Sequence, residues 1–280
     1  MIEVKDLSVR FGRKTVLDSI NVQFGKGEFV TIAGNNGAGK TTFLRTLMGI
    51  VSPFKGKVIY GEGISKAKTG FMSDRSGFFE NFTLKQGIDF HRRVYRLEQY
   101  DDTLLHHLGL DLKAKVKHLS VGERVLFLFS LVIAQKPGIL FIDEIMHTID
   151  PYLRDVFLEH LLEVIDRFNT TVITVNHTFS EIETIPGRIL VMEDGRFILD
   201  ESAEVLKTKI KKIEAPGEIP GDIPVLYKKA VLDYNEYYVY PFNEELRKSF
   251  DYQFRDLKLS EIIKSLIGGY YVKKRISRSS

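Results

Sequence analysis

FVTIAGNNGAGKTTFLRTLM, residues 29–48, decides the fold of this 280-residue chain. Its first five residues predict a buried strand, and the segment from Lys40 to Met48 predicts a helix. The glycine-rich turn between them fits the pattern G-x-x-x-x-G-K-[ST], in which backbone N–H groups and the helix N-terminus point at a phosphate. The candidate phosphate-binding residues are Gly34, Asn35, Asn36, Gly37, Ala38, Gly39, Lys40 and Thr41.

A second apolar run, Ile139–Ile142, is followed by two carboxylates, Asp143 and Glu144. A strand that simply ends in polar residues is common, but a parallel sheet places ligand sites at such strand ends. In the phosphate loop, Lys40 would neutralise the β- and γ-phosphates of a nucleotide and the Thr41 hydroxyl would ligate Mg²⁺. Asp143 would hold the same ion through water, and Glu144 would polarise the attacking water.

The remaining pattern indicates an α/β fold with a mainly parallel sheet, because short apolar runs alternate with amphipathic helical segments up to about residue 205. The alternation in Ile2–Val9 predicts a strand, and we expect an antiparallel N-terminal β subdomain. Residues 80–118 are polar and helical in pattern, which predicts an inserted helical subdomain covering about 80–135.

A boundary is expected where proline and glycine cluster, between Ala215 and Pro224. We therefore predict a core domain over residues 1–212 and a small α+β accessory domain over 213–280. The strand-like runs Val225–Leu232 and Tyr237–Tyr240 and the helical run Leu257–Ile267 support this prediction. We expect the accessory domain to be dispensable for nucleotide binding.

Composition excludes several classes of protein. A net charge of +3 gives no field strong enough to indicate nucleic acid as a partner. The absence of cysteine excludes disulfides and zinc–thiolate sites. The longest apolar run, Val125–Ala134, is about half of the roughly 20 residues that a membrane-spanning helix needs, so we expect the chain not to cross a membrane itself.

Three further signals are ambiguous on their own. Ser120 and Glu123 form a capping box that would start any helix, and the same helix N-terminus, with Gly122, would suit a γ-phosphate. His177 follows a strand but is a lone histidine, which is more often structural than catalytic. Phe11 is either a core residue or an aromatic platform for adenine.

Taken in order, these features resemble the ATP-binding-cassette (ABC) ATPase family over roughly residues 1–205. The resemblance implies a phosphate loop that extends to Thr42, a signature at Ser120–Glu123 and a catalytic glutamate at Glu144. It also implies that Thr148–Asp150 meets a partner subunit, that His177 contacts the γ-phosphate and that Phe11 stacks on adenine. In this family two cassettes pair head to tail, so that ATP on one phosphate loop is capped by the signature of the other.

The chain departs from the family pattern at three places. Asp74 stands where the family has a glutamine, and its shorter, charged side chain is the third candidate Mg²⁺ ligand beside Thr41 and Asp143. Val121 replaces the first glycine of the signature, and Ile145 and Met146 follow the glutamate in place of proline and threonine. We interpret these changes as divergence, because Lys40 and the other matched chemical groups are retained.

The resemblance implies an ATP- and Mg²⁺-dependent ATPase on the cytoplasmic face of the cell membrane. Its partners would be a separate polytopic transmembrane subunit and a second cassette, either identical or related. The C-terminal region resembles that of drug- and peptide-exporter cassettes, which favours export. A soluble cassette protein acting in translation or DNA repair is the alternative, although such members usually carry two cassettes or long coiled coils. A generic phosphate-loop kinase or GTPase would not need the signature or His177.

Overall fold

The computed structural model describes residues 2–61, 68–73, 79–176 and 187–279. Six strands form its central sheet: β3 (Phe29–Ala33), β5 (Thr69–Ser73), β6 (Ile139–Asp143), β7 (Thr171–Asn176), β8 (Arg188–Glu193) and β9 (Arg196–Ser202). Their order in the sheet is β5-β6-β7-β3-β8-β9. All neighbouring pairs are parallel except β8 and β9. The predicted α/β fold with a mainly parallel sheet is confirmed.

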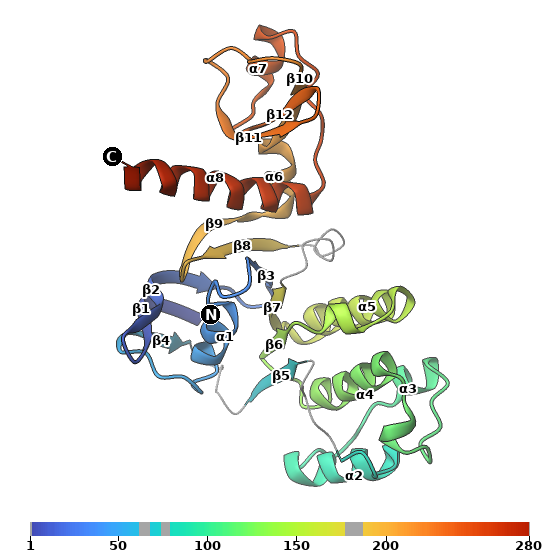
Figure 1. Cartoon of the computed structure of the whole chain (residues 1–280). Helices are drawn as coiled ribbons and strands as arrows, with labels where there is room; N and C mark the ends of the chain where they lie inside the picture. Colours follow the sequence, from blue (N-terminus) through green and yellow to red (C-terminus); the bar gives the residue numbers. More distant parts are fainter. Residues whose placement is uncertain (1, 62–67, 74–78, 177–186, 280) are drawn as a thin grey trace.

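Every residue of β3 and β7 is buried, which is the pattern of strands covered by other elements on both faces. One face packs against α1 (Lys40–Leu47) and the N-terminal strands. The other face packs against α4 (Val121–Ile133) and α5 (Pro151–Phe168). Figure 1 shows α1 and α4 on different sides of β5 and β6.

The N-terminal part forms a three-stranded antiparallel sheet, as predicted. Its strands are β1 (Ile2–Phe11), β2 (Lys14–Phe24) and β4 (Lys55–Tyr60), in the order β2-β1-β4. In the central strand, Val4 is paired with Val22 on one side and with Val58 on the other. This sheet shares one apolar core with α1, where the rings of Phe24 and Phe43 lie 6.3 Å apart.

The inserted region is helical and has a small core of its own. It contains α2 (Leu84–Tyr95), α3 (Thr103–His107), the short 3-10 helix η2 (Val116–His118) and α4. Thr83 begins α2 with a capping box completed by Gln86. The buried residues between these helices are Leu84, Ile88, Leu105, Val116, Phe127 and Leu131. A second short helix, η3 (Met146–Thr148), precedes α5.

The C-terminal part adds a three-stranded antiparallel sheet in the order β10-β12-β11. Its elements are α6 (Ala203–Lys209), β10 (Lys211–Ala215), β11 (Val225–Val231), β12 (Tyr234–Val239), α7 (Glu244–Ser249) and α8 (Leu259–Ser279). The predicted division between residues 212 and 213 falls inside β10, and it stays a prediction.

Helix α8 lies between the C-terminal sheet and the central sheet, as Figure 1 shows. Ile262, Ile263 and Leu266 are buried in a cluster that also contains Ile189 and Val191 of β8. Removing the residues after 212 would therefore expose apolar side chains of the central sheet to water. This packing argues that the C-terminal part supports the core and is not simply appended to it.

Among the residues that the structure describes, no helix combines the length and the apolar character that a membrane span requires.

Candidate active site

The phosphate loop connects β3 to α1, and its backbone requires glycine at particular positions. Gly34 has a φ of 154° and Gly39 a φ of 108°, values that other residues rarely adopt. A Cβ atom on Gly34 would lie 2.1 Å from the carbonyl oxygen of Met192, and one on Gly39 would lie 2.8 Å from Leu17 Cδ2. The loop is therefore held tightly between β2 and the end of β8.

Lys40 is 5% exposed and lies under the loop. Its Nζ donates hydrogen bonds to the carbonyl oxygens of Gly34, at 2.8 Å, and Asn35, at 3.0 Å. Burial lowers the pKa of Lys40, whereas the carboxylates of Glu144, Glu193 and Asp143 act in the opposite direction. A buried cation whose Nζ lies against the loop is positioned to interact with an anionic group bound on the loop.

The acidic strand β6 meets the phosphate loop. Thr41 Oγ1 donates to Asp143 Oδ1 at 3.4 Å, although the two residues are 102 positions apart. Glu144 has a left-handed backbone with a φ of 55°, and its N–H donates to the carbonyl oxygen of Val175 at 3.1 Å. A left-handed glutamate carries backbone strain of a kind that clusters at functional sites.

The hydroxyl of Thr41 and the carboxylate of Asp143 fit a hard cation such as Mg²⁺, which prefers oxygen ligands. Asp74 and His177, the other predicted metal and switch residues, lie outside the described residues. The predicted site residues Asn36, Gly37 and Thr42 lie on the loop or in the first turn of α1. Phe11, at the end of β1, is 54% exposed and so presents its ring to solvent.

The signature residues begin α4. Ser120 Oγ accepts from the N–H of Glu123 at 3.2 Å, and Glu123 Oε2 accepts from the N–H of Ser120 at 2.7 Å, which completes the capping box. A Cβ on Gly122 would lie 2.6 Å from Leu153 Cδ1 and 3.5 Å from Asp150 Oδ2. This glycine therefore allows close contact with the start of α5. The signature therefore lies against Ile149 and Asp150. Helix α4, which these residues begin, lies apart from α1 of the same chain in Figure 1.

Sequence reasoning missed one residue of the site, Glu193. Its side chain is 1% exposed, and its Oε1 accepts from the N–H of Asn35 in the phosphate loop at 2.9 Å. Its position at the end of the apolar run Ile189–Met192 repeats the pattern by which Asp143 was found. The same rule applied to β8 would have identified it.

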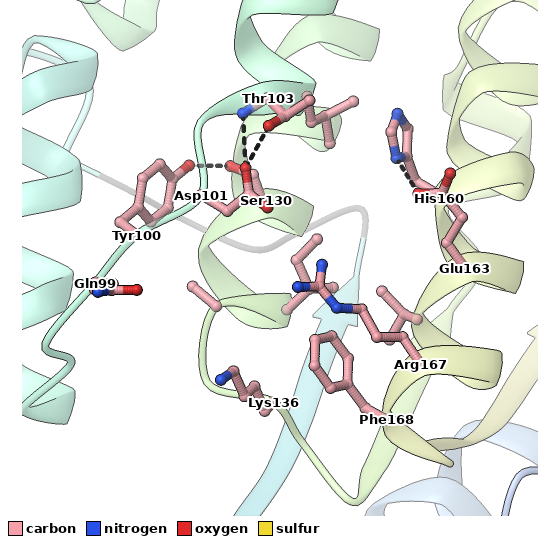
Figure 2. A pocket seen from close by; sticks show the side chains of 14 residues that line it. Gln99, Tyr100, Asp101, Thr103, Ser130, Lys136, His160, Glu163, Arg167 and Phe168 are labelled. Carbon is pink, nitrogen blue, oxygen red and sulfur yellow. Dashed lines mark hydrogen bonds and ion pairs between the residues drawn. The ribbon is translucent and has the colours of Figure 1, made fainter.

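Two cavities lie away from the phosphate loop. One, of about 620 Å³, lies between α3, α4 and α5 and appears in Figure 2. Polar side chains that line it form hydrogen bonds with one another. The hydroxyl oxygens of Tyr100 and Ser130 lie 2.6 Å apart, and His160 Nδ1 lies 2.9 Å from Glu163 Oε2. The other is an open groove of about 790 Å³ between β5, α2 and α4. Its lining includes the exposed side chains of Phe71, Phe79, Phe90, Val94 and Tyr95.

Comparison with known proteins gives a consistent result. The family model described as ABC transporter matches residues 17–147. The sulfate/thiosulfate import ATP-binding protein of Nitrosomonas europaea is 31% identical over 70% of this chain and 59% of its own length. The ABC transporter ATP-binding protein YtrB of Bacillus subtilis is 26% identical over 76% of each chain. The Nod factor export ATP-binding protein of Paraburkholderia xenovorans is 29% identical over 73% of this chain and 72% of its own length.

Solved structures agree on the fold. An ATP-binding subunit of an ABC transporter has a TM-score of 0.66 at 21% identity, over 74% of this chain and 92% of that chain. A dimeric ATP-binding cassette bound to ADP and phosphate has a TM-score of 0.60 at 20% identity, over 72% of this chain and 98% of that chain. These identities are low, and the likeness concerns the fold alone.

Proposed function

Because the chain carries an ATPase domain of the ABC transporter family, we propose that it binds and hydrolyses ATP with Mg²⁺ to power a membrane transporter. The observation that carries this proposal is the contact of Thr41 with Asp143, which brings the phosphate loop to the strand that also ends in Glu144. Lys40 would offset phosphate charge, and Glu144 would orient and polarise the attacking water. Bound Mg²⁺ would supply charge neutralisation at the β- and γ-phosphates.

The purified wild-type chain should release phosphate from ATP in the presence of Mg²⁺. Removal of the metal by EDTA should abolish that release, and restoring Mg²⁺ should recover it, because Thr41 and Asp143 are suited to hold this ion. The measurement is steady-state phosphate release. A rate unaffected by EDTA would contradict the proposed metal-dependent mechanism.

The site is proposed to be completed by a second copy or a related cassette. Ser120 and Gly122 stand at the N-terminus of α4, where backbone N–H groups favour an anion. In Figure 1 helix α4 lies apart from α1, the helix that follows the phosphate loop of the same chain, so its N-terminus would serve the nucleotide held by a partner. Closure of the pair around ATP, and its reopening after hydrolysis, would be passed on to the membrane partner.

We propose that the partner is a separate polytopic subunit and that the chain works at the cytoplasmic face of the cell membrane. The groove between β5, α2 and α4 is the proposed docking site, because five large apolar side chains are exposed together there. A short helix of the membrane subunit with an apolar face would fit it. Export is the proposed direction, supported by the Nod factor export relative.

Phe90→Glu should abolish co-purification of a polytopic protein from detergent-solubilised membranes, because it places a charge in the apolar groove. Phe54→Glu is a matched control, since Phe54 is similarly exposed, at 52% against 42%, but lies outside the groove. ATP hydrolysis by the isolated chain should persist in both variants. Equal loss of the membrane protein in both, or in neither, would contradict docking at this groove.

A further inference from the structure

The end of β8 and the turn that joins it to β9 hold the phosphate loop at two points. Glu193 Oε1 accepts from the N–H of Asn35, at 2.9 Å. The N–H of Gly195 donates to the carbonyl oxygen of Ala38, also at 2.9 Å. These bonds lie on either side of the exposed loop tip at Asn36 and Gly37. The position of this turn therefore determines the position of the loop on which the phosphates would bind.

The C-terminal helix α8 in turn holds Glu193. The hydroxyl of Tyr271 donates to Glu193 Oε2 at 2.8 Å, across 78 positions of sequence. A carboxylate that is 1% exposed depends strongly on each hydrogen bond it receives. Partial burial and the Glu193 carboxylate raise the pKa of Tyr271 to about 12, so its hydroxyl remains a donor at the pH of ordinary assays. The neighbouring Tyr270 also bonds the turn between β8 and β9, where its hydroxyl donates to Asp194 Oδ2 at 3.2 Å.

The placement of α8 is fixed by close packing on the C-terminal sheet. A Cβ on Gly269 would lie 2.7 Å from the carbonyl oxygen of Leu226 in β11. A Cβ on Gly268 would lie 2.9 Å from the ring of Tyr227. These two glycines directly precede Tyr270 and Tyr271, and they let helix α8 approach β11 closely. Contacts run continuously from β11 through α8 and Glu193 to the phosphate loop.

We propose that Tyr271 is a positioning residue for the ATP site and acts through Glu193 on the phosphate loop. The C-terminal helix is then a working part of nucleotide binding. This inference rests on the proposed function, because it concerns how the same loop binds ATP. The hydrogen bond would keep the loop close to its binding geometry, so that less ordering is required when the nucleotide binds.

Tyr271→Phe removes the hydroxyl and keeps the ring. We expect the Kd for ATP to rise about 3- to 10-fold, in line with the loss of one hydrogen bond to a carboxylate. The kcat at saturating ATP should stay within about twofold, because the lost interaction supports binding and does not act on the attacking water. Calorimetry on the full-length chain measures the Kd, and phosphate release measures kcat.

Tyr237→Phe is the matched control, since it makes the same change in the C-terminal sheet, where the lost hydroxyl donates to the carbonyl oxygen of Gly217 at 2.8 Å and not to the turn between β8 and β9. It should leave the Kd for ATP unchanged. Glu193→Ala should weaken binding more than Tyr271→Phe, because it removes both the bond to Asn35 and the bond to Tyr271. In the Glu193→Ala background, Tyr271→Phe should raise Kd less than it does in the wild type, because the bond to Glu193 is already lost and only the contact of Tyr271 with the side chain of Asn35 remains.

A second readout separates positioning from general stability. Hydrogen exchange of the peptide covering residues 29–43 should be faster in Tyr271→Phe than in the wild type, even without nucleotide. An unchanged Kd in Tyr271→Phe, an effect of equal size in Tyr237→Phe, or full additivity with Glu193→Ala would each overturn the proposal. A wild-type chain that bound no ATP would overturn the proposed function itself. If the wild type binds ATP and the Tyr271→Phe variant binds it equally well, only the role of Tyr271 is overturned.

Discussion

Glu144→Gln is expected to slow ATP hydrolysis by roughly 10²- to 10⁴-fold, the contribution typical of a group that positions and deprotonates water. Binding of ATP should be retained, because the amide is nearly the same size and the phosphate loop is unchanged. The structure supports this assignment by placing Glu144 directly after Asp143 and close enough to Lys40 to influence its pKa. Phosphate release and calorimetry on one preparation would measure both quantities.

The matched control is Glu159→Gln, which makes the same chemical change on the exposed surface of α5. It should turn over at the wild-type rate. Wild-type turnover in Glu144→Gln would remove this residue from the mechanism.

Ser120→Arg is expected to eliminate hydrolysis while the isolated chain still binds ATP, because the signature is proposed to act on the partner's nucleotide. Lys40→Ala is expected to weaken ATP binding itself, since it removes the buried cation under the phosphate loop. Each variant alone should therefore be inactive, for two different reasons.

Mixing the two inactive variants should restore activity. A mixed dimer would pair the intact phosphate loop of the Ser120→Arg chain with the intact signature of the Lys40→Ala chain. With random exchange of subunits in a two-fold symmetric dimer, about a quarter of the wild-type sites would be complete. A mixture of wild type with Ser120→Arg calibrates the exchange. A loss of ATP affinity in isolated Ser120→Arg would contradict the assignment, because it would put Ser120 in its own chain's site.

The elements that carry the chemistry could be predicted from the sequence because their signals are local. The apolar run at β3, the glycine turn and the helix that follows are contiguous, and they appear in the structure in that order. The acid at the end of β6 was found for the same reason, since a strand that is entirely buried shows no alternation and ends at the first charged residue.

The support behind the phosphate loop could not be predicted in this way. The bond between Tyr271 and Glu193 joins residues 78 positions apart and leaves no periodic signal in either segment. Strand β10 was missed because its sequence over Lys211–Ala215, Lys-Lys-Ile-Glu-Ala, does not form an apolar run. The packing of α8 on β8 depends on which face of the sheet remains open, and this is decided by the tertiary structure.

The central claim is that ATP binding closes two cassettes around shared sites. Light scattering on Glu144→Gln tests it most directly, because slow hydrolysis preserves the ATP-bound state. With ATP and Mg²⁺ the particle mass should be about twice the 32.1 kDa of the single chain, and with ADP it should return to that of one chain. A single-chain mass in the presence of saturating, demonstrably bound ATP would contradict the account.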